Sequence, residues 1–202
     1  MKILFYDIKE FEFDYLSSHI SNNIEPYFFR FHLNSQTYID NKYIDCDAIS
    51  LFTTSEITKE ILSKLKNLKY IFLRCSGYSN VDVNYCKRHN IKVFNTPNYG
   101  SSTIAEYAFG LILNIARKIT KAQYDLYKGE ANHDELRGFE LKNKTLGIIG
   151  LGHIGKKIAE IAKGFNMKSV IFDIKKEPDY NYVEIDELYE TSDIIVVSCP
   201  LT

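Results

Sequence analysis

The 202-residue sequence has no tryptophan, few cysteines, no excess of charge of one sign and no long apolar run. Its four cysteines lack C-x-x-C spacing, so neither a zinc site nor a redox motif is indicated, and we expect reduced thiols, three of them buried. The net charge of −1 predicts no binding to nucleic acid. The longest apolar stretch, from Ile104 to Ala116, contains Glu106 and is too short to span a bilayer. We therefore expect a cytoplasmic protein with no membrane partner and no metal site.

The remaining composition is typical of a globular protein with a substantial core. Hydrophobic residues make up 45% of the chain and charged residues 25%, and 202 residues allow one large domain or two small ones. In the first half, short apolar runs alternate with helical patterns, which predicts a parallel sheet covered on both faces. The predicted strands are residues 2–6, 26–31, 48–52, 68–73 and 91–94. The predicted helices are residues 11–21, residues 56–65 with Thr53-Thr54-Ser55 as their cap, and residues 83–89.

A segment rich in turn-forming residues divides the chain. Pro97-Asn98-Tyr99-Gly100-Ser101-Ser102 is the best candidate hinge and ends in a helix N-cap, which predicts domains at residues 1–98 and 99–202. A long helix over residues 103–117 follows, with a second piece to residue 127 and a polar loop over residues 128–137. The apolar stripe of the long helix can serve either a subunit interface or the core of its own domain, and consists of Ile104, Ala108, Leu111, Ile112 and Ile115.

The second domain opens on a strand followed by three spaced glycines. Residues 146–149 form a continuous apolar run, as in a strand buried on both faces, and G-x-G-x-x-G follows directly. Gly150 permits a tight turn, Gly152 has no Cβ to hold a pyrophosphate away from the backbone, and Gly155 allows the next helix to pack closely on the sheet. The pattern predicts a dinucleotide site, although an ordinary glycine-rich turn of an α/β protein is the alternative.

The segment after the glycines supports the dinucleotide interpretation. A helix over residues 154–163, with Gly164 at its C-cap, would direct its N-terminal N–H groups and dipole at the phosphates. The strand at residues 169–172 ends at Asp173, whose carboxylate can accept hydrogen bonds from the adenosine ribose and repel a 2′-phosphate. Lys175 and Lys176 soften that repulsion, so NAD is favoured and NADP remains open.

Several motifs in the same order resemble the D-isomer-specific 2-hydroxyacid dehydrogenases. The similarity covers the chain from about Ala48 to its end, and Tyr99 and the His153-Ile154 pair look most like the D-lactate dehydrogenase branch. The resemblance implies an α/β protein with a flavodoxin-like N-terminal substrate domain and the first half of a Rossmann-type NAD-binding domain. The matching segments are LKYIFLRCSGYSNVD at residues 68–82, IKVFNTPNYG at 91–100, TIAEYA at 103–108, FELKNKTLGIIGLGHIG at 139–155 and SDIIVVSCPLT at 192–202.

The resemblance also implies a substrate site in the first domain. Ser76 and Gly77 match the loop whose backbone N–H groups hold the substrate carboxylate, and two peptide donors bind an anion without a charged side chain. Tyr99 matches a tyrosine that contacts substrate, with an aromatic residue packed at the hinge as the alternative. Thr103 matches a residue near the cofactor at the start of the interdomain helix, with helix capping as the alternative.

Further positions are implied on the cofactor side. His153 and Ile154 match the backbone under the pyrophosphate, and Cys199 and Pro200 match a loop along the adenosine. Many relatives carry histidine where this chain has Ser198, so the contact of that imidazole is not expected here. The implied reaction is hydride transfer between NAD(H) and a small 2-hydroxy or 2-keto acid, with D-lactate and pyruvate the leading pair. The catalytic arginine, glutamate and histidine of the family lie beyond the Cys-Pro-Leu-Thr motif, so no catalytic residue is assigned and the chain alone is expected to be inactive.

Expectations on assembly follow from the same resemblance. With half of a cofactor domain, the strand from residue 146 would lose a neighbour and the strand at residues 194–197 would form the far edge of the sheet. A fragment of a longer enzyme is the preferred explanation, with a natural truncation or a partner chain as alternatives. Relatives imply a homodimer through the helix at residues 103–117. A non-catalytic NAD-binding or regulatory module of the same fold is the rival function.

Overall fold

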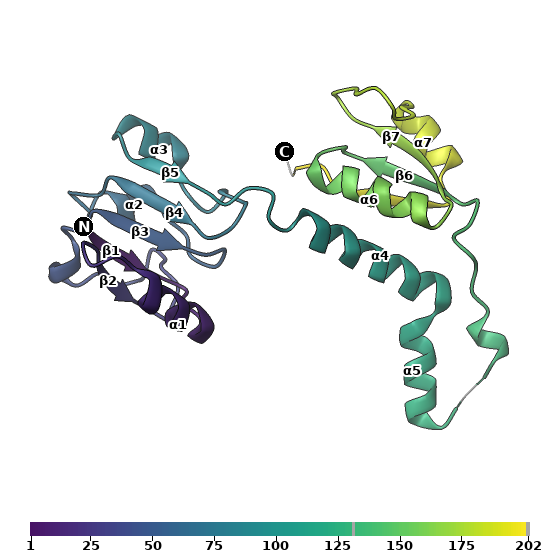
Figure 1. The fold of residues 1–202 in the computed structure, drawn as a ribbon, viewed down its shortest axis with the longest axis horizontal. Helices are drawn as coiled ribbons and strands as arrows, with labels where there is room; N and C mark the ends of the chain where they lie inside the picture. The colour runs from purple at the N-terminus through teal and green to yellow at the C-terminus, as the bar shows by residue number, and fades with distance from the viewer. Residues whose placement is uncertain (131, 201–202) are drawn as a thin grey trace. The chain divides into compact units, whose positions relative to one another are not determined.

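The computed structural model describes residues 1–130 and 132–200, which divide into a first unit, Met1–Tyr99, and a second unit that begins at Gly100 (Figure 1). Ala131 of the predicted polar loop and Leu201 and Thr202 of the Cys-Pro-Leu-Thr motif lie outside the described residues. Both units are α/β structures with parallel strands, as the alternating pattern predicts.

The first unit is built on five parallel strands in the order β2-β1-β3-β4-β5. This is the doubly wound order expected of a flavodoxin-like domain, with the reversal between β1 and β3. All five strands predicted from the apolar runs are present, with β2 three residues shorter at its end than expected. The strands are β1 (Lys2–Phe5), β2 (Glu25–Phe28), β3 (Ala48–Leu51), β4 (Tyr70–Leu73) and β5 (Lys92–Phe94).

Helices cover both faces of this sheet. Helix α1 (Glu10–His19) lies over Phe5 and Phe28, whereas α2 (Lys59–Leu62) and α3 (Val83–Arg88) pack on the opposite face, and a 3₁₀ turn, η1 (Asn41–Tyr43), precedes β3. Side chains alternate between the two faces along each strand, and the α2 and α3 face carries most of the fully buried residues. Burying each such aliphatic side chain contributes about 1.5–3 kcal/mol. The core between the sheet and helices α2 and α3 includes Leu4, Ile49, Leu51, Ile61 and Ile71.

The helix predicted over residues 56–65 with a cap at Thr53-Thr54-Ser55 is wrong in its start. Helix α2 begins at Lys59, with Thr58 as its N-cap residue, and ends at Leu62, three residues before the predicted end. The Ser55 hydroxyl is buried and has long-range partners: it accepts from the backbone N–H of Leu33 at 2.8 Å and donates to the Asp7 carboxylate. A side chain held by residues more than twenty positions away is not free to cap the neighbouring helix, so the first turn forms later.

Arg74 ties together the carboxyl ends of the strands in the first unit. Its Nε donates to Glu12 of α1 at 3.0 Å, one terminal nitrogen donates to Ser50 at 3.0 Å, and the other donates to the backbone carbonyl of Tyr6 at 2.8 Å. The Arg74 and Glu12 side chains are mostly buried, at 17% and 19% exposed. The guanidinium therefore has a structural role next to the loop that carries Ser76.

The second unit begins with two consecutive helices, α4 (Ser101–Arg117) and α5 (Ile119–Lys128). Helix α4 starts two residues earlier than predicted, with Gly100 and not Ser102 at its N-cap. Its predicted end at Arg117 is confirmed, because Lys118 adopts a left-handed conformation with φ of 53° and separates the two helices. A 3₁₀ turn, η2 (Asp134–Leu136), lies in the connection to the sheet.

Three parallel strands follow in the order β7-β6-β8: β6 (Thr145–Ile149), β7 (Lys168–Phe172) and β8 (Ile194–Val197). The expectation that the strand from residue 146 loses a neighbour is therefore wrong, because β8 pairs with β6 on the side away from β7. The strand at residues 194–197 does lie at an edge of this sheet, as expected. After β7 the chain first runs along its outer side, where Tyr182 bridges Ile171, and then crosses to the opposite side of β6. The strand order thus reverses between β6 and β8, inside the described chain.

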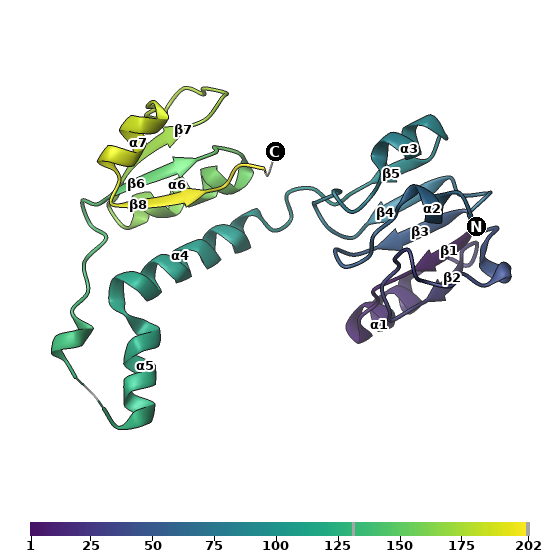
Figure 2. The same ribbon diagram turned by 180° about the vertical axis from the view of Figure 1, so that it is seen from behind.

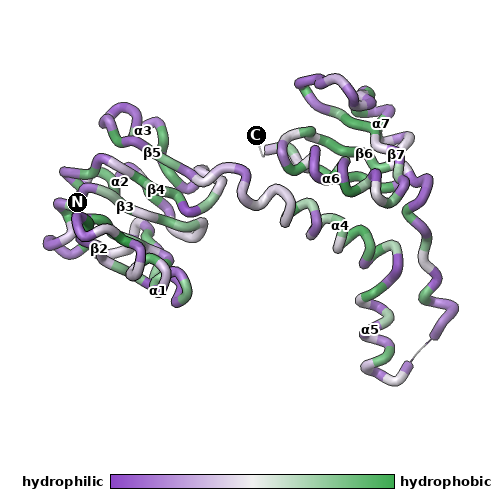
Figure 3. The backbone as a smooth tube through the Cα atoms, in the orientation of Figure 1, coloured by the Kyte–Doolittle hydropathy of each residue, from purple (hydrophilic) through white to green (hydrophobic). Residues whose placement is uncertain are grey.

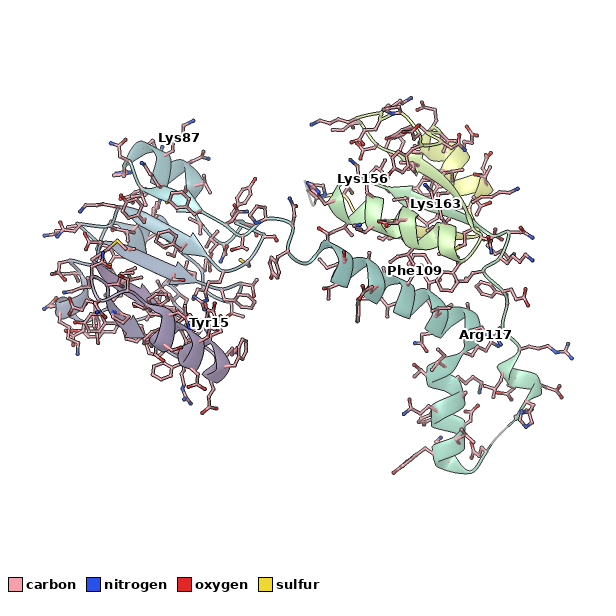
Figure 4. All side chains as sticks on the ribbon, in the orientation of Figure 1. Tyr15, Lys87, Phe109, Arg117, Lys156 and Lys163 are labelled. Carbon is pink, nitrogen blue, oxygen red and sulfur yellow. The ribbon has the colours of Figure 1, made fainter. Side chains whose placement is uncertain are left out.

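Helices α6 (His153–Gly164) and α7 (Ile185–Thr191) cover opposite faces of this sheet (Figures 1 and 2). Helix α4 packs on α6, and Phe109 of α4 is labelled in Figure 4. Its ring stacks on that of Phe165, with the centroids 5.3 Å apart. On the other face Leu188 of α7 packs so closely that a Cβ on Gly147 would lie 2.7 Å from it. Gly164 is the last residue of α6 and not its C-cap, which is Phe165, and the left-handed residue that follows is Asn166, with φ of 54°.

The predicted apolar stripe of α4 is divided between a buried and an exposed face of the helix. Ile112 is buried with Ala105, Phe109 and Ala116, whereas Ile104, Leu111 and Ile115 of the predicted stripe are exposed. Apolar residues are visible along both α4 and α5 in Figure 3. No helix within the described ranges is long and apolar enough to cross a membrane.

Candidate functional site

The candidate site lies where three strands of the second unit end. Gly150 follows β6, Asp173 follows β7 and Ser198 follows β8, and the carboxyl ends of parallel strands meet at one edge of a sheet. The crevice beside the reversal of strand order is where open α/β sheets bind ligands. The reversal between β6 and β8 coincides with the glycine turn after β6, so the turn lies at such a crevice.

Two of the three glycines are required by the protein's own packing. Gly150 has φ of 94°, a conformation that other residues rarely adopt, and a Cβ there would lie 2.7 Å from the backbone nitrogen of Cys199. A Cβ on Gly155 would lie 2.1 Å from the carbonyl oxygen of Gly150. Gly150 thus allows the segment after β8 to approach, and Gly155 allows α6 to lie against the turn.

Gly152 differs from the other two, because no contact among residues 1–130 and 132–200 requires a glycine there. It is the N-cap residue of α6, its φ is −69°, and an added Cβ would meet no atom within 4 Å. His153 is exposed and Ile154 is half-buried, so the first turn of α6 presents its unpaired N–H groups beside open space. Helix N-termini with open access bind anions through these groups and the helix dipole.

The Asp173 carboxylate is held at this edge by backbone donors. One oxygen accepts from the N–H of Lys175 at 2.8 Å and the other from the N–H of Leu151 at 2.6 Å. These two hydrogen bonds, that of Lys175 first, hold the pKa of Asp173 below its ordinary value, against a smaller opposing effect of burial. An ionised carboxylate has about four lone-pair positions, so two remain for further donors.

Ser198 is a part of the site that the sequence analysis did not assign. Its hydroxyl donates to the carbonyl of Gly150 at 2.6 Å, and its backbone N–H donates to Ile149 at 2.8 Å. Cys199 and Pro200, which follow it, are exposed, and Cys199 is the one exposed cysteine of the chain, as the expectation of three buried thiols requires. The sequence does contain a signal that could have identified Ser198 as a site residue, namely a hydroxyl residue directly after the strand at residues 194–197.

In the first unit, the loop after β4 exposes two backbone donors. The Ser76 hydroxyl donates to the carbonyl of Thr96 at 2.9 Å, and the Asn95 side chain donates to the carbonyl of Ser76 at 2.7 Å. Within the described part of the chain the N–H groups of Ser76 and Gly77 donate to no acceptor, and a Cβ on Gly77 would meet nothing within 4 Å. The loop is therefore held by its side chains and carbonyls, while the N–H groups of these two exposed residues have no acceptor in the described chain, an arrangement suited to an anion.

The remaining predicted positions lie near the junction of the two units. Tyr99, the last residue of the first unit, is 64% exposed. Thr103 lies exposed in the first turn of α4, and because Gly100 is the N-cap residue, the alternative of Thr103 as a helix cap is excluded. Among residues 1–130 and 132–200, no group of three or more histidine, cysteine, aspartate or glutamate side chains could hold a metal ion.

The strand order, the glycine turn and the carboxylate after β7 define a dinucleotide-binding fold of the Rossmann type. Residues 109–202 match the family model of the D-isomer specific 2-hydroxyacid dehydrogenase, NAD binding domain. The chain belongs to the family of D-isomer-specific 2-hydroxyacid dehydrogenases. The NAD-binding domain of that family confirms NAD as the cofactor.

Individual relatives resemble the chain over most or all of its length. D-lactate dehydrogenase of Escherichia coli is 33% identical over 210 residues, with the whole chain matching 63% of that protein. Hydroxypyruvate reductase of Thermotoga maritima is 39% identical over 161 residues, covering 78% of the chain and 53% of that protein. D-lactate dehydrogenase from Aquifex aeolicus, solved with NAD and lactic acid, gives a TM-score of 0.90 at 28% identity over 99% of the chain and 61% of that structure. The chain thus spans about half to two thirds of the length of these relatives.

Proposed function

We propose that the protein serves NAD-dependent hydride transfer between a 2-hydroxy acid and the corresponding 2-keto acid in the cytoplasm, with D-lactate and pyruvate as the leading pair. The observation that carries this proposal is the open space at Gly152. A Cβ added there would meet none of the described atoms within 4 Å, so we infer that the glycine serves a ligand that must approach the backbone. Support for the acid comes from relatives named D-lactate dehydrogenase, hydroxypyruvate reductase and glyoxylate reductase.

In this proposal the second unit holds the cofactor at the carboxyl edge of its sheet. The backbone from Gly150 to Gly155, including His153 and Ile154, receives the pyrophosphate, and Asp173 accepts from the adenosine ribose. Thr103, Cys199 and Pro200 line the remaining length of the cofactor. The ionised Asp173 carboxylate disfavours a 2′-phosphate, which supports NAD over NADP. NAD supplies hydride acceptance at its nicotinamide when bound.

The first unit, up to the junction near residues 98 and 99, holds the acid. The N–H groups of Ser76 and Gly77 bind the substrate carboxylate, with Tyr99 as a further contact. Asn95 and Thr96 keep the loop in place through the hydrogen bonds to Ser76, so that the two donors are oriented before the acid arrives.

Gly152→Ala is expected to leave the fold intact and to weaken NAD binding at least tenfold, about 1.4 kcal/mol. The new Cβ meets no atom of the described residues within 4 Å, but it occupies the side from which the pyrophosphate reaches the helix N-terminus. Isothermal titration of the 202-residue chain with NAD measures the affinity, and circular dichroism measures the melting temperature.

The matched control is Gly110→Ala in α4, where an added Cβ also meets nothing within 4 Å and no ligand is proposed. It should bind NAD as the parent does. Equal NAD affinity of Gly152→Ala and the parent would contradict the role of the glycine turn.

Pyruvate or oxamate is expected to shift the backbone amide resonances of Ser76 and Gly77 in an isotope-labelled chain, because their N–H groups gain a carboxylate acceptor. Acetamide, which has no carboxylate, serves as the control and should shift neither. Shifts confined to other residues would contradict the assignment of this loop.

We further propose that the partner of α4 and α5 is a second copy of the chain. Outside the packed face of α4, Tyr107 and Ile115 are 69% and 71% exposed, and α5 exposes Leu126 and Tyr127 at 69% and 90%. Exposed apolar area of this extent on adjoining helices favours burial in an interface, and homo-oligomers most often use self-complementary surfaces.

A further inference from the structure

One peptide group of the glycine turn is held at both of its polar ends. The peptide that joins Gly150 to Leu151 accepts at its carbonyl from the Ser198 hydroxyl at 2.6 Å and donates its N–H to Asp173 at 2.6 Å. Ser198 follows β8 and Asp173 follows β7, the two strands that flank β6. The two side chains therefore hold the peptide from opposite sides.

The turn needs such restraint because of its conformation. A glycine at φ of 94° has several backbone conformations of similar energy, so the peptide plane that follows Gly150 is weakly fixed by local preference. Its orientation determines where the next N–H groups, those of Gly152 and His153, are directed. Gly155 lies directly against the same Gly150 carbonyl, so a rotated peptide would also lose its packing on α6.

We propose that Asp173 and Ser198 are positioning residues that lock the Gly150–Leu151 peptide in the orientation that receives the pyrophosphate of NAD. This inference rests on the proposed binding of NAD at this edge. Ser198 acts only on the turn, whereas Asp173 acts on the turn and on the ribose. A change of Asp173 that admits a 2′-phosphate therefore also releases the turn, which couples cofactor choice to loop geometry.

Inorganic pyrophosphate separates the two roles of Asp173, because it contacts the turn but has no ribose. Asp173→Asn is expected to weaken both NAD and pyrophosphate, since an amide in that place cannot accept from two N–H groups with both of its terminal atoms. A residue that acted through the ribose alone would leave the affinity for pyrophosphate unchanged, or raise it through the loss of a negative charge.

Ser198→Ala tests the other side of the peptide. It is expected to weaken NAD and pyrophosphate by the same factor, about tenfold, and to speed hydrogen exchange at the Leu151 N–H, while Ser198→Thr, which keeps the hydroxyl, restores the affinity. Ser192→Ala is the matched control, because the Ser192 hydroxyl is buried in the same unit without a hydrogen-bond partner among the described residues. Its NAD affinity should equal that of the parent.

Titration of the 202-residue chain with NAD and with pyrophosphate distinguishes a failure of the proposed cofactor site from a failure of the positioning role of Asp173 and Ser198. A parent chain that binds neither ligand would contradict the proposed cofactor site itself. A parent that binds NAD, together with a Ser198→Ala variant of unchanged affinity and unchanged Leu151 exchange, would overturn the lock while leaving the cofactor site standing. Unchanged binding of pyrophosphate by Asp173→Asn would overturn the positioning role of Asp173.

Discussion

Gly155→Ala is expected to destabilise the second unit by about 4 kcal/mol, a large part of the stability of a domain this size. The added Cβ would lie 2.1 Å from the Gly150 carbonyl oxygen and 2.9 Å from the Ser198 hydroxyl. The first of these atoms belongs to the backbone, so relief requires α6 to move away from β6. That movement would open the core between α6 and the sheet, where Ile148 and Ile158 are buried.

Thermal unfolding followed by circular dichroism measures this effect. Gly164→Ala is the matched control, since it lies in the same helix and its Cβ would meet nothing within 4 Å. That variant should be as stable as the parent or slightly more so, because alanine is favoured over glycine in helices. Equal melting of Gly155→Ala and the parent would mean that the close approach of α6 to the turn is not needed for folding.

The sequence was a good guide to the glycine turn because its signals are local. Gly150 and Gly155 stand where a left-handed turn and a close approach need them, and the apolar runs before and after them mark β6 and β7. The start of α6 at His153 lies one residue from the predicted start, since a helix N-terminus follows directly from the turn. Local backbone requirements of this kind are visible in the residue types themselves.

The position of β8 could not be predicted in the same way. Its apolar residues indicate a strand, but they do not say on which side of β6 the strand is paired. That choice depends on the path of residues 173–193, which places Tyr182 beside β7 and α7 under Gly147 before the chain crosses over. Strand order is thus decided by long-range packing, and with it the presence of the reversal that forms the cofactor crevice.

The roles of two serines could not be predicted either, because their hydrogen-bond partners are distant in the sequence. Ser55 has the type and place of a helix cap, but its hydroxyl bonds to Asp7, 48 positions earlier. Ser198 was considered only for the histidine it replaces, whereas its hydroxyl reaches Gly150, 48 positions away. A short polar side chain can serve a local cap or a long-range contact equally well, and only the fold decides between them.

Substitutions on the exposed face of α4 are expected to prevent the chain from forming a dimer. We expect the parent to sediment at twice its mass of 23.4 kDa, and Ile115→Glu and Tyr107→Glu to sediment as single chains. In a two-fold interface each substituted residue is buried twice, so the dimer would have to bury two glutamates without partners. Both parent side chains are about 70% exposed on the free chain, so the substitutions should leave the fold of the second unit unchanged.

Phe11→Glu is the matched control, because Phe11 lies on a helix of the first unit and is 74% exposed. It exchanges an exposed apolar residue for the same acid and should sediment with the parent. Analytical ultracentrifugation over a range of concentrations distinguishes the outcomes. A parent that remains a single chain at every concentration would refute the dimer, and dissociation by Phe11→Glu but not by Ile115→Glu would place the interface on the first unit. Dissociation by the two α4 variants alone, with unchanged melting, would assign the exposed stripe of α4 to the subunit contact, since the buried stripe at Phe109 and Ile112 already packs within the unit.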